Sequence, residues 1–426
     1  MHLTMHKYPV QDIAWGQKTG YEQGTLTINK EELLQSLSEY EQRWGIKVTA
    51  LELVKPGTSM RVINIFDVFA ARARLGKGAV NYPGVLGPVS SVGTGTTAAL
   101  EQFSVLAISV VPDRYNKLLD MSGFGSELTP YGEMHHLAFQ AEPIDKNMKN
   151  NDYFSALKRM GLKIGTYLAQ AASEAEPVQI TEYTLDPRPA DLPRAVYICM
   201  ISSHQRSEVD EPILYGDDVQ GLLPTILHPN EMLDGAVVAP YWNLGIDTYS
   251  FQNNPAVLDL YKRHGRDVDF AGVIAYVAHV TREKRARSTA VITNLVSNVL
   301  KADLAVVSKL GGGIPESDLL MIIESLEKQG VRTSGFIWSY MGDGTIYDSI
   351  SANSEAADAL ASVGIYDDWL DLPPQTHVFG GTQVGPFTAD PNEKPVDAHQ
   401  ALKVCYRDIC GAVSQLGASR LAMVEV

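Results

Sequence analysis

The alternation of apolar strand-like runs with helical patterns after residue 193 most constrains the fold of this chain. Runs rich in β-branched residues recur there, among them AVYICMI, FAGVIAYVA and DLAVVS, and amphipathic stretches such as ESDLLMIIESLEKQG lie between them. Strands that alternate with helices build βαβ units, in which the strands pair in parallel. The pattern therefore predicts a mostly parallel, doubly wound α/β domain over residues 194–426.

The first part of the chain follows a different pattern. Short β-like runs, such as GTLTIN, IKVTALELV and MRVINIFDVF, are separated by glycine, proline and asparagine, which predicts a β-rich domain over residues 1–150. Residues 151–193 begin with apolar positions at helical spacing and continue into a proline-containing stretch, so they predict a helix and a linker. The predicted fold class is α/β, with the β-rich domain preceding the parallel one.

Composition narrows the class of protein. A hydrophobic content of 45% and a charged content of 20% indicate folded domains, and no apolar run reaches the roughly 18–20 residues that a membrane helix needs. A formal net charge of −15 argues against a nucleic-acid partner, which would require a concentrated basic face. The N-terminus resembles no targeting segment, and the three cysteines form no CxxC pair, so we expect a cytoplasmic protein.

Three loops follow predicted strands of the parallel domain. They span Ser202–Asp210, Pro240–Asn254 and Ser308–Pro315. Ligands of open α/β sheets bind beyond the carboxyl ends of the strands, so these loops predict a small-molecule site. In the third loop, the glycines of SKLGGGIPES predict either a carboxylate cradle at a helix N-terminus or a tight structural turn.

Several blocks of sequence resemble one family in order along the chain. They are TLTINKEELL, VGTGTT, DMSGFGSELTP, NEMLDGAVV, NNPAVLDLYKRHG and PESDLLMIIESLEKQGVRT. The chain is similar in these blocks to the component B proprotein of glycine, sarcosine and betaine reductases. The resemblance implies a reductase in which a central cysteine becomes a pyruvoyl group that captures a substrate amine. It also implies a separate subunit whose thiol or selenol attacks the substrate carbon.

The chain departs from this family where the central cysteine is expected. The segment reads PYWNLGIDTYS, and Trp242 stands near the expected position. Self-cleavage needs a thiol or hydroxyl at the scissile residue, and the hydroxyls of Thr248 and Ser250 lie several residues too late. We therefore expect an uncleaved chain without a pyruvoyl group.

The altered loop offers aromatic and amide groups suited to a small hydrogen-bonding ligand. Asp247 is its acid–base candidate, with a turn-capping aspartate as the alternative. The resemblance also implies a place near the site for the threonines of VGTGTT. The predicted substrate-binding residues are Tyr241, Trp242, Asn243, Tyr249, Gln252, Asn253, Thr94 and Thr96.

The run GEMHH provides a second candidate site. In an extended segment Glu133 and His135 share a face, so this run could bind a divalent metal ion with a third ligand from elsewhere, such as His204 or His228. His135 and His136 could equally act as general bases. The alternative is that one histidine is buried and hydrogen-bonded while the other is exposed.

Three functions follow from these observations. The first is a component-B-like subunit that cleaves a C–N bond of a small amine or amide together with a thiol or selenol subunit. The second is a hydrolase of amide or cyclic amide bonds that uses a metal at Glu133, His135 and His136. The third is a non-catalytic scaffold for the partner subunit. In each case we expect an oligomer.

Overall fold

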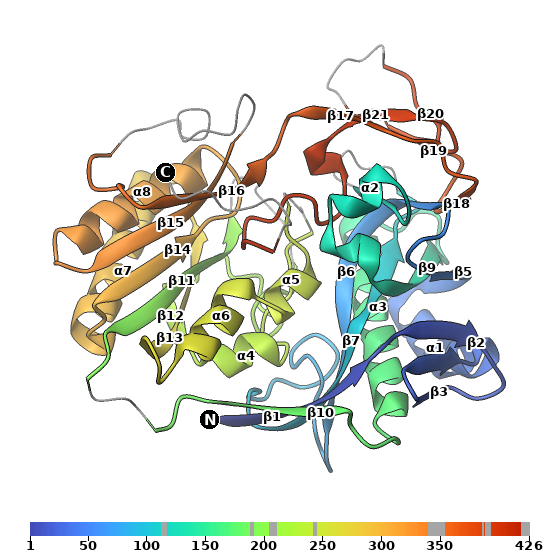
Figure 1. The fold of residues 1–426 in the computed structure, drawn as a ribbon, viewed down its shortest axis with the longest axis horizontal. Helices are drawn as coiled ribbons and strands as arrows, with labels where there is room; N and C mark the ends of the chain where they lie inside the picture. The colour runs from blue at the N-terminus through green and yellow to red at the C-terminus, as the bar shows by residue number, and fades with distance from the viewer. Residues whose placement is uncertain are drawn as a thin grey trace.

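The computed structural model describes residues 1–111, 117–187, 191–203, 211–241, 245–339, 354–385, 387 and 393–418. These residues form two large sheets that lie next to each other, with short helices between them (Figure 1). The mixed α/β content predicted from the sequence is confirmed. No helix within the described residues is long and apolar enough to span a membrane.

The N-terminal sheet has eight strands and both parallel and antiparallel pairs. Its long central strands β6 and β7 pair antiparallel, and β7 also pairs in parallel with β1 and β9. The strands are β1 (His2–Pro9), β5 (Ile46–Val54), β6 (Met60–Leu75), β7 (Gly95–Ile108), β8 (Lys117–Asp120), β9 (His135–Pro143), β10 (Gln179–Thr184) and β18 (His377–Phe379).

The predicted helix after residue 150 is α3 (Asn150–Ala172), which packs against the N-terminal sheet. Two glycines on α3 allow this close approach, since a Cβ at Gly161 would lie 2.2 Å from the Phe69 ring and one at Gly165 would lie 3.1 Å from the Ala70 carbonyl. The glycines therefore have a packing role that offsets their poor helix propensity. Helix α1 (Lys30–Trp44) and a small sheet lie nearby; that sheet consists of β2 (Asp12–Trp15), β3 (Gly20–Glu22) and β4 (Thr25–Ile28).

The second sheet is here called the parallel sheet. Its strand order is β12-β13-β11-β14-β15-β16, and the pairs among the last five strands are all parallel. The strands are β11 (Arg194–Ser203), β12 (Thr225–Leu227), β13 (Asp269–Ala278), β14 (Leu304–Ser308), β15 (Arg332–Ser339) and β16 (Leu360–Ile365). The strand order reverses between β11 and β14, which is where such sheets usually bind ligands.

Helices flank the parallel sheet and the space between the two sheets. Figure 1 shows α7 and α8 side by side on one face, while α4, α5 and α6 lie toward the N-terminal sheet. Their bounds are α4 (Pro229–Leu233), α5 (Thr248–Gln252), α6 (Pro255–Arg263), α7 (Arg282–Asn294) and α8 (Ile314–Glu327), and η2 (Leu295–Leu300) continues α7. The doubly wound arrangement stays a prediction.

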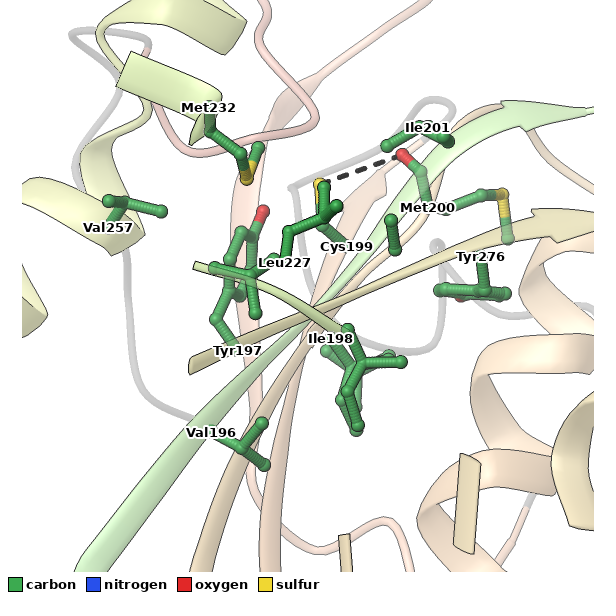
Figure 2. Packing of buried hydrophobic residues seen from close by; sticks show 14 of the residues in the cluster. Val196, Tyr197, Ile198, Cys199, Met200, Ile201, Leu227, Met232, Val257 and Tyr276 are labelled. Atoms are coloured by element: carbon green, nitrogen blue, oxygen red, sulfur yellow. Dashed lines mark hydrogen bonds between the residues drawn. The ribbon is translucent and has the colours of Figure 1, made fainter. Parts of the chain in front are cut away.

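Strand β11 is buried on both faces, as a central parallel strand should be. Val196, Tyr197, Ile198 and Met200 are fully covered, and Figure 2 shows them packed against residues of the neighbouring strands and helices. Cys199 lies in the same strand and is completely buried. Burial raises the pKa of its thiol to about 11, as expected for an inert core cysteine.

The end of the chain returns to the N-terminal sheet. Strand β18 pairs in parallel with β6, and Ile409 forms a bridge with Leu118. The remaining elements are α2 (Phe124–Glu127), η1 (Pro130–Glu133), β17 (Trp369–Leu372), β19 (Gln383–Val384), β20 (Val396–Asp397), β21 (Leu402–Cys405) and η4 (Tyr406–Asp408). The division at residues 150 and 193 stays a prediction, with the C-terminal segment packing back onto the first part.

Candidate functional site

The loop after Ala239 is hydrogen-bonded to Glu211 and, through Gln415, to the turn after β14. It does not follow a strand as predicted, because the GAVV segment forms only an isolated bridge between Leu214 and Val237. The backbone N–H of Tyr241 donates to the carboxylate of Glu211. Gln415 donates its backbone N–H to Gly245 O at 3.0 Å, and its side-chain oxygen accepts from the Gly311 N–H at 2.6 Å. The described parts of the second and third predicted loops thus meet at one edge of the sheet, with the C-terminal segment between them.

A buried ion pair fixes the base of the loop after Ala239. The Lys158 ammonium lies 2.7 Å from Asp67 and donates to Ala239 O at 2.5 Å. The same carboxylate accepts from the Thr248 backbone N–H at 2.9 Å and from its hydroxyl at 2.7 Å. Because every charge here is paired and hydrogen-bonded, the interior tolerates it. The two ends of the loop, Ala239 and Thr248, are therefore held together.

Asp247 caps the first turn of α5 and faces the N-terminal sheet. Its Oδ1 accepts from the Ser250 backbone N–H at 2.7 Å and from the Ser250 hydroxyl at 2.8 Å. Its Oδ2 accepts from the Tyr131 hydroxyl at 2.8 Å. Burial, reinforced by the negative charge of Asp67, raises the pKa of Asp247 to about 6. A carboxyl with such a pKa can hold or release a proton close to neutral pH.

A cavity of about 20 Å³ adjoins Asp247, which is room for about one water molecule. The C-terminal segment supplies its opposite wall. Within the described residues, the buried Ser414 hydroxyl has no hydrogen-bond partner and borders this space. The polar lining consists of Lys117, Tyr131, Asp247, Ser250, Cys410 and Ser414. Carboxyl, phenol and two alcohols therefore surround one water-sized space.

His136 is linked to Asp247 through Tyr131 and is fully buried. Its Nε2 is 2.8 Å from the Tyr131 carbonyl oxygen, so this nitrogen carries the proton. Its Nδ1 is 2.7 Å from the Ser104 hydroxyl, which then donates to it. Burial lowers the pKa of the imidazole to about 4. With both ring nitrogens bonded, His136 has no lone pair for a metal ion or a proton, and its geometry fits a structural role.

His135 and Glu133 do not join His136. His135 directly precedes His136 in β9, so its side chain points to the other face of the sheet. On that face the charges of Asp12 and Lys55 influence it. Burial lowers the pKa of His135. Glu133 is exposed. Among the described residues, no three histidine, cysteine or acidic side chains could hold a metal ion. The expected metal cluster is therefore not formed by Glu133, His135 and His136.

The proposed outside ligands do not change this. His228 caps helix α4, where its Nδ1 accepts from the Asn230 N–H at 3.2 Å. Burial lowers the pKa of His228 to about 4. His204 lies outside the described residues, as do Trp242 and Asn243 of the altered loop.

The amides predicted to bind substrate instead anchor α5 to β6. The Gln252 side chain accepts from Ala70 N–H at 3.2 Å and donates to the Tyr82 hydroxyl at 2.6 Å. The Asn253 side chain accepts from Arg72 at 2.6 Å and donates to Tyr249 O at 3.2 Å. Their hydrogen-bonding groups are used within the protein, so a substrate cannot reach Gln252 without breaking these bonds.

The two aromatic candidates also pack within the fold. The Tyr249 ring meets Tyr131 edge-on at a centroid distance of 5.5 Å. The Tyr241 ring lies 5.6 Å from the Lys158 ammonium. These contacts do not test a substrate-binding role for either residue, which stays a prediction.

The VGTGTT segment contacts a different part of the chain. Gly93 N–H donates to Asp234 at 2.7 Å, and Thr97 donates to the same carboxylate at 2.6 Å. Thr94 is exposed and Thr96 is half-buried. The observed partners of this loop thus belong to the NEMLD segment rather than to α5.

Hydrogen-bonding groups of the glycine-rich turn after β14 already have partners within the chain. The Gly311 N–H is taken by Gln415, as described above, and Lys309 donates to Gly311 O at 3.0 Å. The Lys309 ammonium lies 4.7 Å over the Trp338 ring, and burial lowers its pKa to about 8. These contacts favour the structural turn over the carboxylate cradle.

Sequence reasoning missed Tyr131, Asp67 and Lys158. Tyr131 sits in the PYGE turn just before the histidines, but an isolated tyrosine carries no acid–base signal. Asp67 and Lys158 offered a clearer one, because each is a charge inside an apolar segment, NIFDVF and FSALKRM. Buried charges of this kind are usually paired, although the sequence does not identify the partner.

Comparison with known proteins identifies relatives along nearly the whole chain. A family model described as glycine/sarcosine/betaine reductase component B subunits matches residues 1–424. The glycine reductase complex component B subunits alpha and beta of Acetoanaerobium sticklandii are 30% identical over 433 residues, covering 99% of each chain. The betaine reductase complex component B subunit alpha of Peptoclostridium acidaminophilum is 30% identical, covering 89% of this chain and 88% of its own. No solved structure matches.

Proposed function

Because the chain belongs to the glycine/sarcosine/betaine reductase component B family, we propose that it is an uncleaved, pyruvoyl-free member that acts on a C–N bond of a small amine or amide. The family supports a reductase-like enzyme role. The finer assignment depends on the loop after Ala239, where Asp247 is the acid–base group and no cysteine is present between Pro240 and Asn254.

The residues of this loop fit poorly with formation of a pyruvoyl group. Trp242, Asn243 and Leu244 carry no thiol or hydroxyl. The Thr248 hydroxyl is committed to Asp67 and to the Ala239 N–H, and the Ser250 hydroxyl is committed to Asp247. Both hydroxyls lie within α5, whose helical backbone would have to open before either could attack a preceding carbonyl.

The observation that carries the proposal is the buried Asp247 carboxyl facing a water-sized cavity, with a pKa raised to about 6. As a C–N bond breaks, its electron pair stays on nitrogen, and Asp247 gives that nitrogen a proton directly or through one water. Tyr131 orients the carboxyl by donating to Oδ2. The amine therefore leaves as a neutral, protonated group rather than as an amide anion.

The proposal assigns the attacking group to a second subunit. Within the described residues the cavity contains one thiol, Cys410, and burial raises its pKa well above the ordinary value, so it is a poor nucleophile. A thiolate or selenolate on a partner chain would form the new bond to carbon while the amine leaves. The names of the relatives describe subunits of reductase complexes, which supports such a partner.

Intact-mass spectrometry of the purified protein tests the uncleaved state. We expect one species at the full mass of 46.5 kDa, with no change after borohydride treatment. Two fragments divided near residues 240–250, or a borohydride-dependent mass increase, would contradict the proposal. A relative that retains the central cysteine provides the positive control for cleavage.

Reconstitution with a thiol- or selenol-bearing subunit tests the catalytic role. We expect turnover of small amines only when both chains are present, and loss of turnover with Asp247→Asn. Partner binding with unchanged activity in Asp247→Asn would instead support the scaffold function. Turnover by the isolated chain that stops with a chelator would support the metal-dependent hydrolase.

A further inference from the structure

A second and larger cleft lies between the N-terminal sheet and helix α6. Its volume is about 570 Å³, which is in the range of small-molecule sites. Residues of strands β1 and β10 line one side of it, and residues of α6 line the other. Figure 1 shows where these elements lie in the fold. Asp247 caps the start of α5, whereas Asn253 follows its end and lines this cleft, so the cleft lies at the opposite end of α5 from the Asp247 cavity.

The floor of the cleft contains a buried guanidinium. Arg72 is 7% exposed and donates to Leu233 O, to Gln252 O at 2.8 Å and to Asn253 Oδ1 at 2.6 Å. All three acceptors are neutral oxygens. Over the described ranges, no carboxylate lies within 4 Å of Arg72.

Two other arginines of β6, the buried Arg61 and the half-buried Arg74, each form an ion pair. Arg61 lies 2.6 Å from Asp120, and Arg74 lies 3.0 Å from Asp234. An arginine removed from water is costly without a countercharge, which is why such residues are normally paired. Arg72, which lines the cleft, breaks this pattern: it has no ion-pair partner within 4 Å in the described part of the chain, and Asp234 acts on it only at longer range.

The remaining groups of the cleft favour an anion with a single charge. Lys7 is already paired with Glu101 at 2.7 Å, and Glu182 at the rim is 3.1 Å from His2. Lys262 is exposed on α6 and makes no ion pair with any described residue. Three cations and two carboxylates line the cleft, which leaves one net positive charge. A monoanion balances this charge, whereas a dianion would be repelled by the carboxylates.

His264 adds a hydrogen-bond donor to the same wall. Its Nδ1 accepts from the Phe270 N–H at 3.0 Å, so Nε2 carries the proton of the neutral ring. This Nε2 is buried and has no hydrogen-bond partner in the described part of the chain. His264 lines the same cleft as Arg72, and a buried donor without a partner indicates an acceptor that the described residues do not supply.

We propose that this cleft binds a small monocarboxylate, with the carboxylate seated on Arg72 and approached by Lys262. The planar guanidinium presents paired N–H donors that match a carboxylate in a bidentate manner. Arg72 also holds the last turn of α5 through Gln252 and Asn253, so a bound carboxylate contacts the residue that positions that helix. The inference does not depend on the proposed function, because binding is measured without turnover.

Thermal unfolding of the full chain at constant ionic strength tests the proposal, with butyrate as the probe and butyramide as its neutral control. A ligand that binds only the folded state raises Tm with concentration. We expect a rise with butyrate and none with butyramide. Equal shifts with the two compounds, no shift with either, or a shift with inorganic phosphate alone would each overturn the proposal.

Two variants locate the site. Lys262→Gln should weaken butyrate binding about two- to five-fold, since an exposed charge contributes modestly. Arg72→Lys should weaken it by about ten-fold or more, because a point charge replaces the bidentate fork. Lys146→Gln, on an exposed loop remote from the cleft, is the matched control and should bind as the wild type does. If Arg72→Lys folds poorly, Lys262→Gln decides alone, and wild-type affinity in that variant refutes the site.

Discussion

His136 near the start of β9 and Asp247 at the start of α5 are joined by one tyrosine, Tyr131, but the fold places the two groups in opposite environments. The Tyr131 carbonyl accepts from His136 at 2.8 Å, while the Tyr131 hydroxyl donates to Asp247 at 2.8 Å. The histidine lies in a strand that is paired on both sides, and its two nitrogens are consumed by neighbours. The carboxyl lies in a loop beside a cavity.

This contrast shows that the place of a side chain in the fold affects its pKa more than its residue type does. Imidazole is the side chain most often used for acid–base chemistry near neutral pH, but burial lowers the pKa of His136 to about 4. Aspartate is ordinarily ionised at neutral pH, but burial raises the pKa of Asp247 to about 6. Desolvation thus moves the pKa of the histidine away from neutral pH and moves the pKa of the aspartate toward it.

The largest expected effect is on turnover in Asp247→Asn. The amide keeps the shape of the side chain but cannot transfer a proton, so we expect kcat to fall by about 10²- to 10⁴-fold. The assay is reconstituted turnover, corrected for folded protein by circular dichroism. Asp371→Asn, an exposed acid on β17, is the control. Unchanged kcat in Asp247→Asn would mean that the carboxyl serves only as a cap.

The pH dependence of stability, compared between the wild type and Asp247→Asn, reports on the same carboxyl. Its folded-state pKa of about 6 exceeds the ordinary 3.8, so the folded protein binds this proton more tightly than the unfolded chain does. The resulting stabilisation is fully present below pH 3.8 and is lost as pH rises through about 6. It amounts to about 2–3 kcal/mol. Denaturant unfolding from pH 4 to 7 should show the wild type losing stability relative to Asp247→Asn as pH rises. The difference between the two proteins is the measured quantity, because His136 and His228, whose pKa values burial lowers to about 4, change stability in the opposite direction over this range.

The opposite outcome is expected for His136→Ala. Removing the ring leaves the Ser104 hydroxyl and the Tyr131 carbonyl without partners, which should lower the free energy of unfolding by about 1–3 kcal/mol. Activity per folded molecule should remain within a few-fold of the wild type. His377→Ala, an exposed histidine on β18, controls for the loss of an imidazole. Loss of turnover with full stability would restore His136 to a catalytic role.

The smallest effect is expected for Cys199→Ser. The thiol is buried in β11 and its pKa is raised to about 11, so it is protonated and unreactive at neutral pH. Turnover should be close to that of the wild type when the two proteins are assayed in parallel. If this substitution alone abolished turnover, the nucleophile would belong to this chain, and the argument for a partner subunit would fail.

Much of the architecture could be predicted from local patterns. The strands AVYICMI, FAGVIAYVA and DLAVVS appear as β11, β13 and β14, and the helix after residue 150 appears as α3. These segments are long and strongly apolar, and their neighbours in the sheet follow them in the chain. The return of the C-terminal segment to the N-terminal sheet could not be predicted in this way, because β18 pairs with β6 across some three hundred residues.

For the site, the loop was predicted but most of its partners were not. The sequence predicts Asp247 as an acid–base group, with a turn-capping role as the alternative; the structure shows the cap, and burial raises the pKa of this carboxyl to about 6. The sequence predicts Gln252 and Asn253 as substrate-binding residues, because amide groups in a loop suit recognition of a small hydrogen-bonding molecule. The fold instead uses them to hold α5 against β6, since buried amides must find partners within the protein.

The sequence by itself determined the family, most strands and helices of the parallel sheet, and the absence of a thiol from the central loop, because each depends on residue identity or on local periodicity. The tertiary structure alone decided which polar groups are free. Whether a histidine is a ligand or a structural residue depends on the partners that distant segments bring to it. Ser104 and Tyr131 are these partners for His136, and Asp67 and Tyr131 act in the same way on Asp247. Such partners are brought together by long-range packing, which residue spacing along the chain does not encode.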